Sequence, residues 1–280
     1  MSCEKEKIVS VEGLVVKVRG EGKTGKGTGF LIDYGTFDVC TGDFVLVRGR
    51  NGSGKSTFLR LFRPQSEDYF EVTEGSIRFL EEGFPDKSLD KIHAPNELAR
   101  LNSRTSFIGQ EDKFQSGASA YSAIVDAYKD ACAFAPPGQK SRSRKELDEC
   151  IREYFDKYLV RSLQCDYKTF QRKAVRKWSG GQQKMINVLA GVIKAKICGL
   201  KLVVMDEPLN NLDGINKDIV NALVRELMES NVAIVAITHC QIFSGVNKVL
   251  DLIEQKDGFR KATFTKESVP PHAECLEPFH

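Results

Sequence analysis

The first part of the chain is patterned for β-structure followed by a short helix. Residues 8–18 are rich in β-branched side chains, and short apolar runs at 30–32, 36–39 and 44–48 predict further strands. A glycine-rich segment follows the last run, and residues 56–62 then have apolar side chains at helical spacing. We therefore expect an antiparallel β layer that leads through a glycine-rich loop into a helix.

The middle of the chain is patterned for helices. Residues 119–134 are rich in alanine, with apolar side chains at helical spacing, and from Glu146 the apolar positions recur at i, i+4, i+7, i+8, i+11 and i+12. The segment 135–144 contains two consecutive prolines and predicts a loop. We expect a helical lobe over about residues 111–178.

Strands and helices alternate around this lobe. The pattern predicts strands at 75–80, 106–110, 200–205 and 232–237, helices at 179–196 and 218–230, and a closing hairpin of strands 248–254 and 259–264. The connection through Pro85 and Pro95 is predicted as polar and irregular. The unbroken apolar run at 232–237 is typical of a strand buried on both faces of a parallel sheet.

These elements indicate one α/β domain over residues 1–268, with the lobe inserted in its core and a tail at 269–280. The 41 Lys+Arg and 38 Asp+Glu residues give a formal net charge of +3, which is no strong attraction to nucleic acid or membranes. The eight cysteines are scattered without a Cys-x-x-Cys pair, which favours reduced thiols over disulfides or a zinc site. Because no apolar run approaches the length of a membrane span, we expect a cytoplasmic protein.

The glycine-rich segment matches the pattern of a phosphate-binding loop. Its nine residues fit a glycine, four residues and then Gly-Lys-Ser/Thr: Gly49, Arg50, Asn51, Gly52, Ser53, Gly54, Lys55, Ser56 and Thr57. Glycines let successive backbone N–H groups point at phosphate oxygens without side chains in the way. We expect Lys55 to reach the β- and γ-phosphates and the Ser56 hydroxyl to bind Mg²⁺.

Polar residues follow the later strands. Asp206 and Glu207 come directly after a buried strand, so we expect Asp206 to hold Mg²⁺ and Glu207 to polarise the attacking water. His239 follows the next apolar strand and is expected at the same edge of the sheet, as a sensor of the γ-phosphate. Gln110, also at a strand end, is a candidate ligand of Mg²⁺ or partner of the attacking water.

The chain resembles the ATP-binding cassette (ABC) family of ATPases. The residues that carry the resemblance are Trp178-Ser-Gly-Gly-Gln-Gln183 ahead of Leu202-Val-Val-Met-Asp-Glu-Pro208, then Asn211-Leu-Asp213 and Thr238-His239. The resemblance extends from about residue 8 to residue 264. It implies a P-loop NTPase core of the ABC type with an antiparallel β layer and an inserted helical lobe, and an enzyme that hydrolyses ATP to ADP and phosphate.

The resemblance also implies a dimer, most simply of two identical chains. Each ATP would lie between the phosphate loop of one cassette and the signature of the other, which is Ser179, Gly180, Gly181 and Gln182. By position, the implied roles are a Q-loop glutamine, a catalytic base, a switch histidine and an aspartate that crosses the dimer interface: Gln110, Glu207, His239 and Asp213. ATP and Mg²⁺ are the implied cofactors.

Two positions depart from the family's pattern. Trp178 stands where leucine usually precedes Ser-Gly-Gly-Gln, which bears on the packing behind the signature. An aromatic residue that stacks on adenine is expected upstream of the phosphate loop, and Phe30 and Tyr34 are the candidates. Phe30 is preferred, on the argument that a flat ring stacks on a base.

Three uses of such an ATPase stay open from the sequence. The leading hypothesis is a subunit that energises transport through separate transmembrane subunits, peripheral on the inner face of the membrane. The second is a cassette that remodels protein or nucleic-acid complexes; the basic residues at 140–145 and 172–177 leave nucleic acid open as a less favoured partner. The third is a nucleotide-gated scaffold with slow turnover.

Overall fold

One nine-stranded sheet forms the centre of the protein. The computed structural model describes residues 5–19, 29–63, 70–81, 84–109, 117–133, 142–238, 243–255 and 259–265. Across the sheet the strands follow the order β4 (Phe70–Phe79), β1 (Lys7–Val18), β2 (Phe30–Cys40), β9 (Arg260–Thr265), β8 (Lys248–Glu254), β3 (Phe44–Gly49), β7 (Ala233–Ile237), β6 (Leu202–Asp206) and β5 (Thr105–Ile108).

The strands nearest the N-terminus pair with one another in antiparallel fashion. β1 pairs antiparallel with both β2 and β4. The two short strands predicted at 30–32 and 36–39 are in fact one strand of 11 residues. The break in the pattern falls at Gly35, which has a φ of 72° and pairs with Leu14 beside a register irregularity. Such an irregularity lets pairing continue past the extra residues, so the strand is not interrupted.

β3 belongs to the parallel part of the sheet. It pairs parallel with β7 on one side and β8 on the other, so the prediction that residues 44–48 join the antiparallel layer was wrong. Phe44 and Leu46 enter the hydrophobic cluster on one face of the sheet, whereas Val45 and Val47 enter the cluster on the other. A strand that is buried on both faces belongs at the centre of a parallel sheet.

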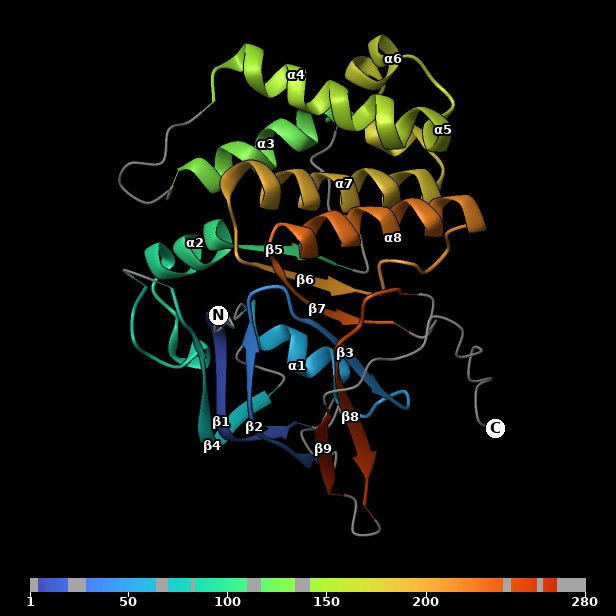
Figure 1. Cartoon of the computed structure of the whole chain (residues 1–280). Coiled ribbons are helices and arrows are strands. Elements are labelled where there is room, and N and C mark those ends of the chain that lie inside the picture. The colour runs from blue at the N-terminus through green and yellow to red at the C-terminus, as the bar shows by residue number, and fades with distance from the viewer. Residues whose placement is uncertain are drawn as a thin grey trace.

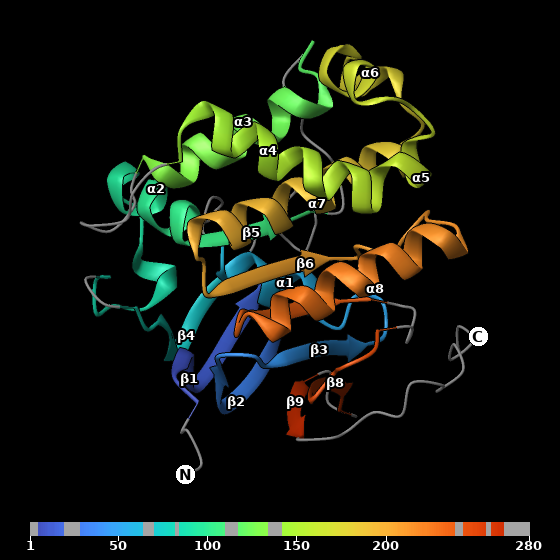
Figure 2. The ribbon, with the colours of Figure 1, turned by 45° about the horizontal axis from the view of Figure 1, so that its top comes forward.

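Helices cover both faces of the parallel strands. α1 (Lys55–Leu61) packs into one hydrophobic cluster, and α7 (Gly180–Cys198) and α8 (Gly214–Glu229) pack into the other and run side by side (Figures 1 and 2). Beyond α7, on its side away from the sheet, lie α3 (Ala120–Cys132), α4 (Arg144–Tyr154), α5 (Val160–Leu163) and α6 (Tyr167–Arg172) (Figure 1). No helix among the described residues is long and apolar enough to cross a membrane.

Two helical segments differ from the sequence prediction. The helix predicted from Glu146 begins at Arg144 as α4 and continues through a π-helical turn, Phe155–Leu159, into α5. α2 (Pro95–Arg104) was missed, because the sequence predicted an irregular connection there. Its proline occupies the first helical position, where no N–H is needed, and Leu101 is its only buried apolar residue. Most of the predicted loop at 135–144 and the whole tail at 269–280 lie outside the described residues.

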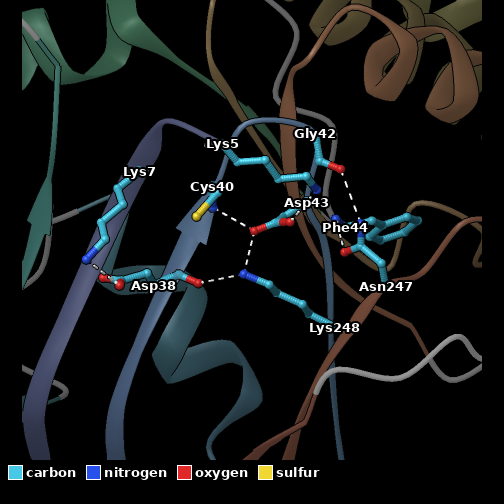
Figure 3. Close-up of polar contacts among 9 residues, drawn as sticks. All are labelled: Lys5, Lys7, Asp38, Cys40, Gly42, Asp43, Phe44, Asn247 and Lys248. Atoms are coloured by element: carbon cyan, nitrogen blue, oxygen red, sulfur yellow. Dashed lines mark hydrogen bonds and ion pairs between the residues drawn. The ribbon is translucent and has the colours of Figure 1, made fainter. Parts of the chain in front are cut away.

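A buried ion pair fixes the turn between β2 and β3. Asp43 is 2% exposed and accepts hydrogen bonds from the Cys40 amide at 2.7 Å and from Lys248 Nζ at 2.6 Å (Figure 3). Lys248, on β8, also donates to the carbonyl oxygen of Asp38 at 2.9 Å. Burial alone would raise the pKa of Asp43, but the hydrogen bonds from Lys248, the Cys40 amide and Lys5 lower it below the usual 3.8. The network therefore links the turn before β3 to the first residue of the neighbouring strand β8.

The first prediction concerns this ion pair. Lys248→Met should lower the free energy of unfolding by about 3–5 kcal/mol, because it leaves the buried Asp43 carboxylate without its main partner. Lys145→Met is the control, since the pair of Lys145 with Glu149 is exposed, and it should cost less than about 1 kcal/mol. Urea unfolding at neutral pH measures both, and equal costs for the two variants would contradict the role given to Lys248.

The same pair has a defined pH dependence. Because the folded-state pKa of Asp43 is depressed, its contribution to stability is present above the unfolded pKa of about 3.9 and is lost as the pH falls through the folded value. The difference in unfolding free energy between the wild type and Lys248→Met should therefore narrow below about pH 4.

Candidate functional site

The parallel pairing of β3, β7 and β6 aligns the carboxyl ends of these three strands at one edge of the sheet. Val47 of β3 and Asp206 of β6 both pair with Ile237 of β7. Because neighbouring strands lie about 4.8 Å apart, the start of the glycine-rich loop and the carboxylate pair leave the sheet about 10 Å from each other. Two predicted site residues, Gln110 and His239, lie outside the described residues.

The backbone of the loop requires glycine at two positions. Gly49 and Gly54 have φ angles of 147° and 103°, in the region that side chains disfavour. A Cβ at Gly49 would lie 2.5 Å from Ser53 Oγ and 2.9 Å from the carbonyl oxygen of Leu252, and one at Gly54 would lie 2.2 Å from Ile32 Cδ1. Both the conformation and the available space therefore exclude larger residues.

Lys55 is held across the loop by backbone carbonyls. Its Nζ donates to the carbonyl oxygens of Gly49 at 2.7 Å and Arg50 at 3.0 Å, and the residue is 7% exposed. An ammonium group has three donors, so these two bonds use two of them. Burial lowers the pKa of Lys55, and the charges of Glu207 and Asp206 oppose that shift. A phosphate beside Lys55 would supply further negative charge.

Asp206 and Glu207 have different surroundings. Burial, and next the neighbouring Glu207, raise the pKa of Asp206. Glu207 has a φ of 48°, its amide donates to the carbonyl oxygen of Ile237 at 3.0 Å, and its Oε2 accepts from Asn210 Nδ2 at 3.0 Å. A left-handed conformation costs a non-glycine residue about 1–3 kcal/mol and is typical of functional sites. Its surroundings thus hold Glu207 in one orientation.

The residues at this edge fit Mg²⁺. The Ser56 hydroxyl is exposed at the start of α1, and Asp206 supplies a carboxylate whose ionised form would gain from a neighbouring cation. Mg²⁺ is usually held by one or two protein oxygens, with phosphate oxygens and waters completing its shell. The donor chemistry therefore suits an ion shared with a bound polyphosphate.

The signature residues begin α7. Ser179 Oγ accepts from the Gln182 N–H at 3.3 Å, and Gln182 Oε1 accepts from the Ser179 N–H at 3.1 Å, which forms a reciprocal capping box. A Cβ at Gly181 would lie 3.2 Å from the carbonyl oxygen of Asn211, whereas one at Gly180 would meet no described atom within 4 Å. The start of α7 therefore contacts the loop after Glu207 on one side and is open on the other.

Trp178 fills the position before the signature as a buried residue. It is 5% exposed and belongs to the hydrophobic cluster around α7. Lys173 Nζ lies 3.6 Å from the centre of its ring, and its carbonyl oxygen accepts from Gln183 Nε2 at 2.8 Å. The tryptophan that replaces leucine is thus buried in the hydrophobic cluster behind the signature.

Three further residues support the site without having been predicted in these roles. Tyr34 is 1% exposed and donates its hydroxyl to the carbonyl oxygen of Gly54 at 2.9 Å, which excludes it as a base-stacking residue and makes it a support of the loop. Lys184, 5% exposed on α7, donates to the carbonyl oxygen of Gly109 at 2.7 Å. Asp213 caps α8 by accepting the Asn216 N–H at 2.8 Å. These contacts depend on tertiary neighbours or cap geometry, which the motifs do not encode.

Phe30, the preferred candidate for stacking on a base, lies at the start of β2 on the same edge as the loop. One face of its ring is covered by Arg260, whose Cζ lies 3.3 Å from the ring centre. Arg260 Nη1 also donates to the carbonyl oxygen of Gly52. The ring is therefore linked to the phosphate loop through an arginine.

Comparisons with known proteins agree on one family. The family model described as "ABC transporter" matches residues 33–210. The ATP-binding protein LolD of a lipoprotein-releasing system from Treponema denticola is 26% identical over 223 residues, which cover 78% of this chain and 84% of that protein. A putative ABC transporter ATP-binding protein of Bifidobacterium longum, BL0043, is 28% identical over 217 residues, and the chain spans 25% of its length.

A solved structure confirms the predicted fold class. The dimeric post-hydrolysis state of the ATP-binding cassette MJ0796, bound to ADP and Pi, matches with a TM-score of 0.65 and 18% sequence identity. The match covers 92% of this chain and 98% of that chain. The protein therefore has the α/β P-loop NTPase fold of ATP-binding cassettes.

The loop glycines give the second prediction. Gly49→Ala should weaken ATP binding by about tenfold or more, because the backbone must leave its left-handed conformation and the methyl group must displace its neighbours. Gly214→Ala is the control, since its added carbon would meet no described atom within 4 Å. Calorimetric titration with ATP measures both, and wild-type affinity in Gly49→Ala would show that the loop conformation is not required.

Proposed function

Because the chain belongs to the ABC transporter family, we propose that it is a nucleotide-binding subunit that dimerises around Mg-ATP and energises transport through separate transmembrane subunits. Its enzymatic class is that of the family, an ATPase. The observation that supports the proposal is the shared level of the strand ends, at which the charges of Glu207 and Asp206 act on Lys55 of the phosphate loop.

The residues of this chain have separable roles in hydrolysis. Backbone N–H groups of the loop and the third donor of Lys55 bind the β- and γ-phosphates. Ser56 and Asp206 would hold Mg²⁺, which would neutralise phosphate charge. Glu207 polarises the attacking water and accepts its proton, and the hydrogen bond from Asn210 orients the carboxylate for that task.

The signature completes the site from a second copy of the chain. Ser179 and the Gly180 amide lie exposed at the start of α7, a 19-residue helix whose N-terminus carries positive partial charge. Facing the phosphate loop of a partner cassette, they bind the γ-phosphate only when the two copies close. ATP then stabilises the closed dimer, and hydrolysis lets it open. The dimeric arrangement of the structural relative MJ0796 supports this geometry.

Transport is the use that the relatives favour. LolD, which aligns over most of its own length, is the ATP-binding protein of a lipoprotein-releasing system, and the energy-coupling factor protein EcfA1 is an ATP-binding protein of a transporter. By analogy, this cassette passes the closing and opening of its dimer to membrane-embedded partner chains.

The third prediction separates binding from hydrolysis. Lys55→Ala should abolish tight ATP binding, whereas Glu207→Gln should bind ATP normally, lose about 10²–10⁴-fold in turnover and remain dimeric in ATP. Phosphate release and size-exclusion chromatography measure these effects. Glu153→Gln, an exposed residue of α4, serves as the matched control. Normal turnover by Glu207→Gln would overturn the assignment of the base.

The fourth prediction concerns partners. Tagged Glu207→Gln, purified in mild detergent with ATP and Mg²⁺, should retain a multi-span membrane protein that mass spectrometry identifies. The complex should be lost with Lys55→Ala, which does not form the ATP-bound dimer. Recovery of only soluble proteins or nucleic acid would contradict the transport role and would favour the remodelling hypothesis, which stimulation of the ATPase by those partners then tests.

A further inference from the structure

The order of the strands gives the phosphate loop two unlike sides. β7 and β6, which end at Ile237 and Asp206, lie on one side of β3, and β8, β9 and β2 lie on the other. A nucleotide whose terminal phosphate points toward Asp206 must therefore extend its base over the side formed by β8, β9 and β2. The residues at the edge of these three strands are candidates for contact with the base.

Arg260 and Phe30 lie at that edge. β9 runs antiparallel to β8, so Arg260 at the start of β9 is paired with Glu254 at the end of β8. β2 begins at Phe30 and runs parallel to β9, with Ile32 paired to Arg260. Because β8 is also parallel to β3, both residues lie at the edge of the sheet from which the phosphate loop leaves.

The two side chains are in contact with each other and are attached to the loop. Arg260 Cζ lies 3.3 Å from the centre of the Phe30 ring, which is direct contact of the guanidinium with the ring face. Arg260 Nη1 also donates a hydrogen bond to the carbonyl oxygen of Gly52, which attaches the guanidinium to the phosphate loop. Both residues are half-buried, so part of the pair is accessible to solvent.

We propose that Arg260 is the residue on which the nucleotide base stacks, and that Phe30 supports it from behind. The proposal rests on the proposed function, in which the loop binds ATP. A guanidinium is planar and stacks on aromatic rings with either face, so it can lie between Phe30 and a base. A purine gains more from stacking than the smaller pyrimidine ring. Arg260 is therefore a specificity-determining residue for ATP, and the direct contact expected for Phe30 is taken over by the arginine.

Base preference provides the test, because ATP and UTP share the same ribose and phosphates. The wild type should bind ATP about tenfold more tightly than UTP. Arg260→Lys keeps the positive charge but removes the planar guanidinium group. It should therefore weaken ATP binding by about tenfold and leave UTP binding nearly unchanged. Phe30→Leu should act in the same direction, and the double variant should lose little more than either single variant.

Controls separate this role from a structural one. Arg152→Lys changes the same residue type over another ring, that of Tyr167 at 5.1 Å, and should alter neither affinity. The proposal would be overturned if Arg260→Lys weakened the binding of ATP and UTP equally, left both unchanged or tightened ATP binding. A wild type that binds ATP and UTP equally well would also overturn it. A wild type that binds neither nucleotide would instead contradict the proposed function. Thermal unfolding of each variant verifies that it is folded.

Discussion

The parallel register of β3, β7 and β6 is the constraint on which the site depends. Val47 and Asp206 reach the same level because each pairs with Ile237. That register is fixed by packing, since Phe44 contacts Phe243 on one face of the sheet while Val45 faces the opposite cluster. A slip of one residue would exchange the two faces and misalign the loop with the carboxylates. The geometry of the site is therefore determined by residues that touch no ligand.

Burial disfavours the charged forms of two residues at the site. It lowers the pKa of Lys55 and raises that of Asp206. The loss of hydration thus outweighs the attraction between the two opposite charges. A polyphosphate beside Lys55 and a divalent cation beside Asp206 bring the missing opposite charges, and they also attract each other. Each ligand thus strengthens the binding of the other, which physically links nucleotide and metal affinity in the proposed function.

The sequence predicted what local patterns determine and missed what distant contacts determine. The glycines of the loop, the helix that follows the signature and the carboxylates after β6 could be predicted from local patterns, and the α/β class from the alternation of elements. The parallel pairing of β3 was mistaken because antiparallel strands precede it along the chain. The contact of Arg260 with Gly52 spans 208 residues, and no periodicity reports such a pairing. α2 was missed because it buries little apolar surface and starts with proline.

α7, the helix that begins with the signature, contacts two segments of the candidate site within one chain. Lys184 binds the carbonyl oxygen of Gly109, next to Gln110, and Gly181 packs against Asn211 in the loop that follows Glu207. α7 is a continuous helix, so a displacement of its N-terminus moves these two contacts together. In the proposed dimer that N-terminus faces the ATP bound by the partner cassette. In that dimer, closure on one nucleotide would therefore displace, through α7, the residues around the other nucleotide.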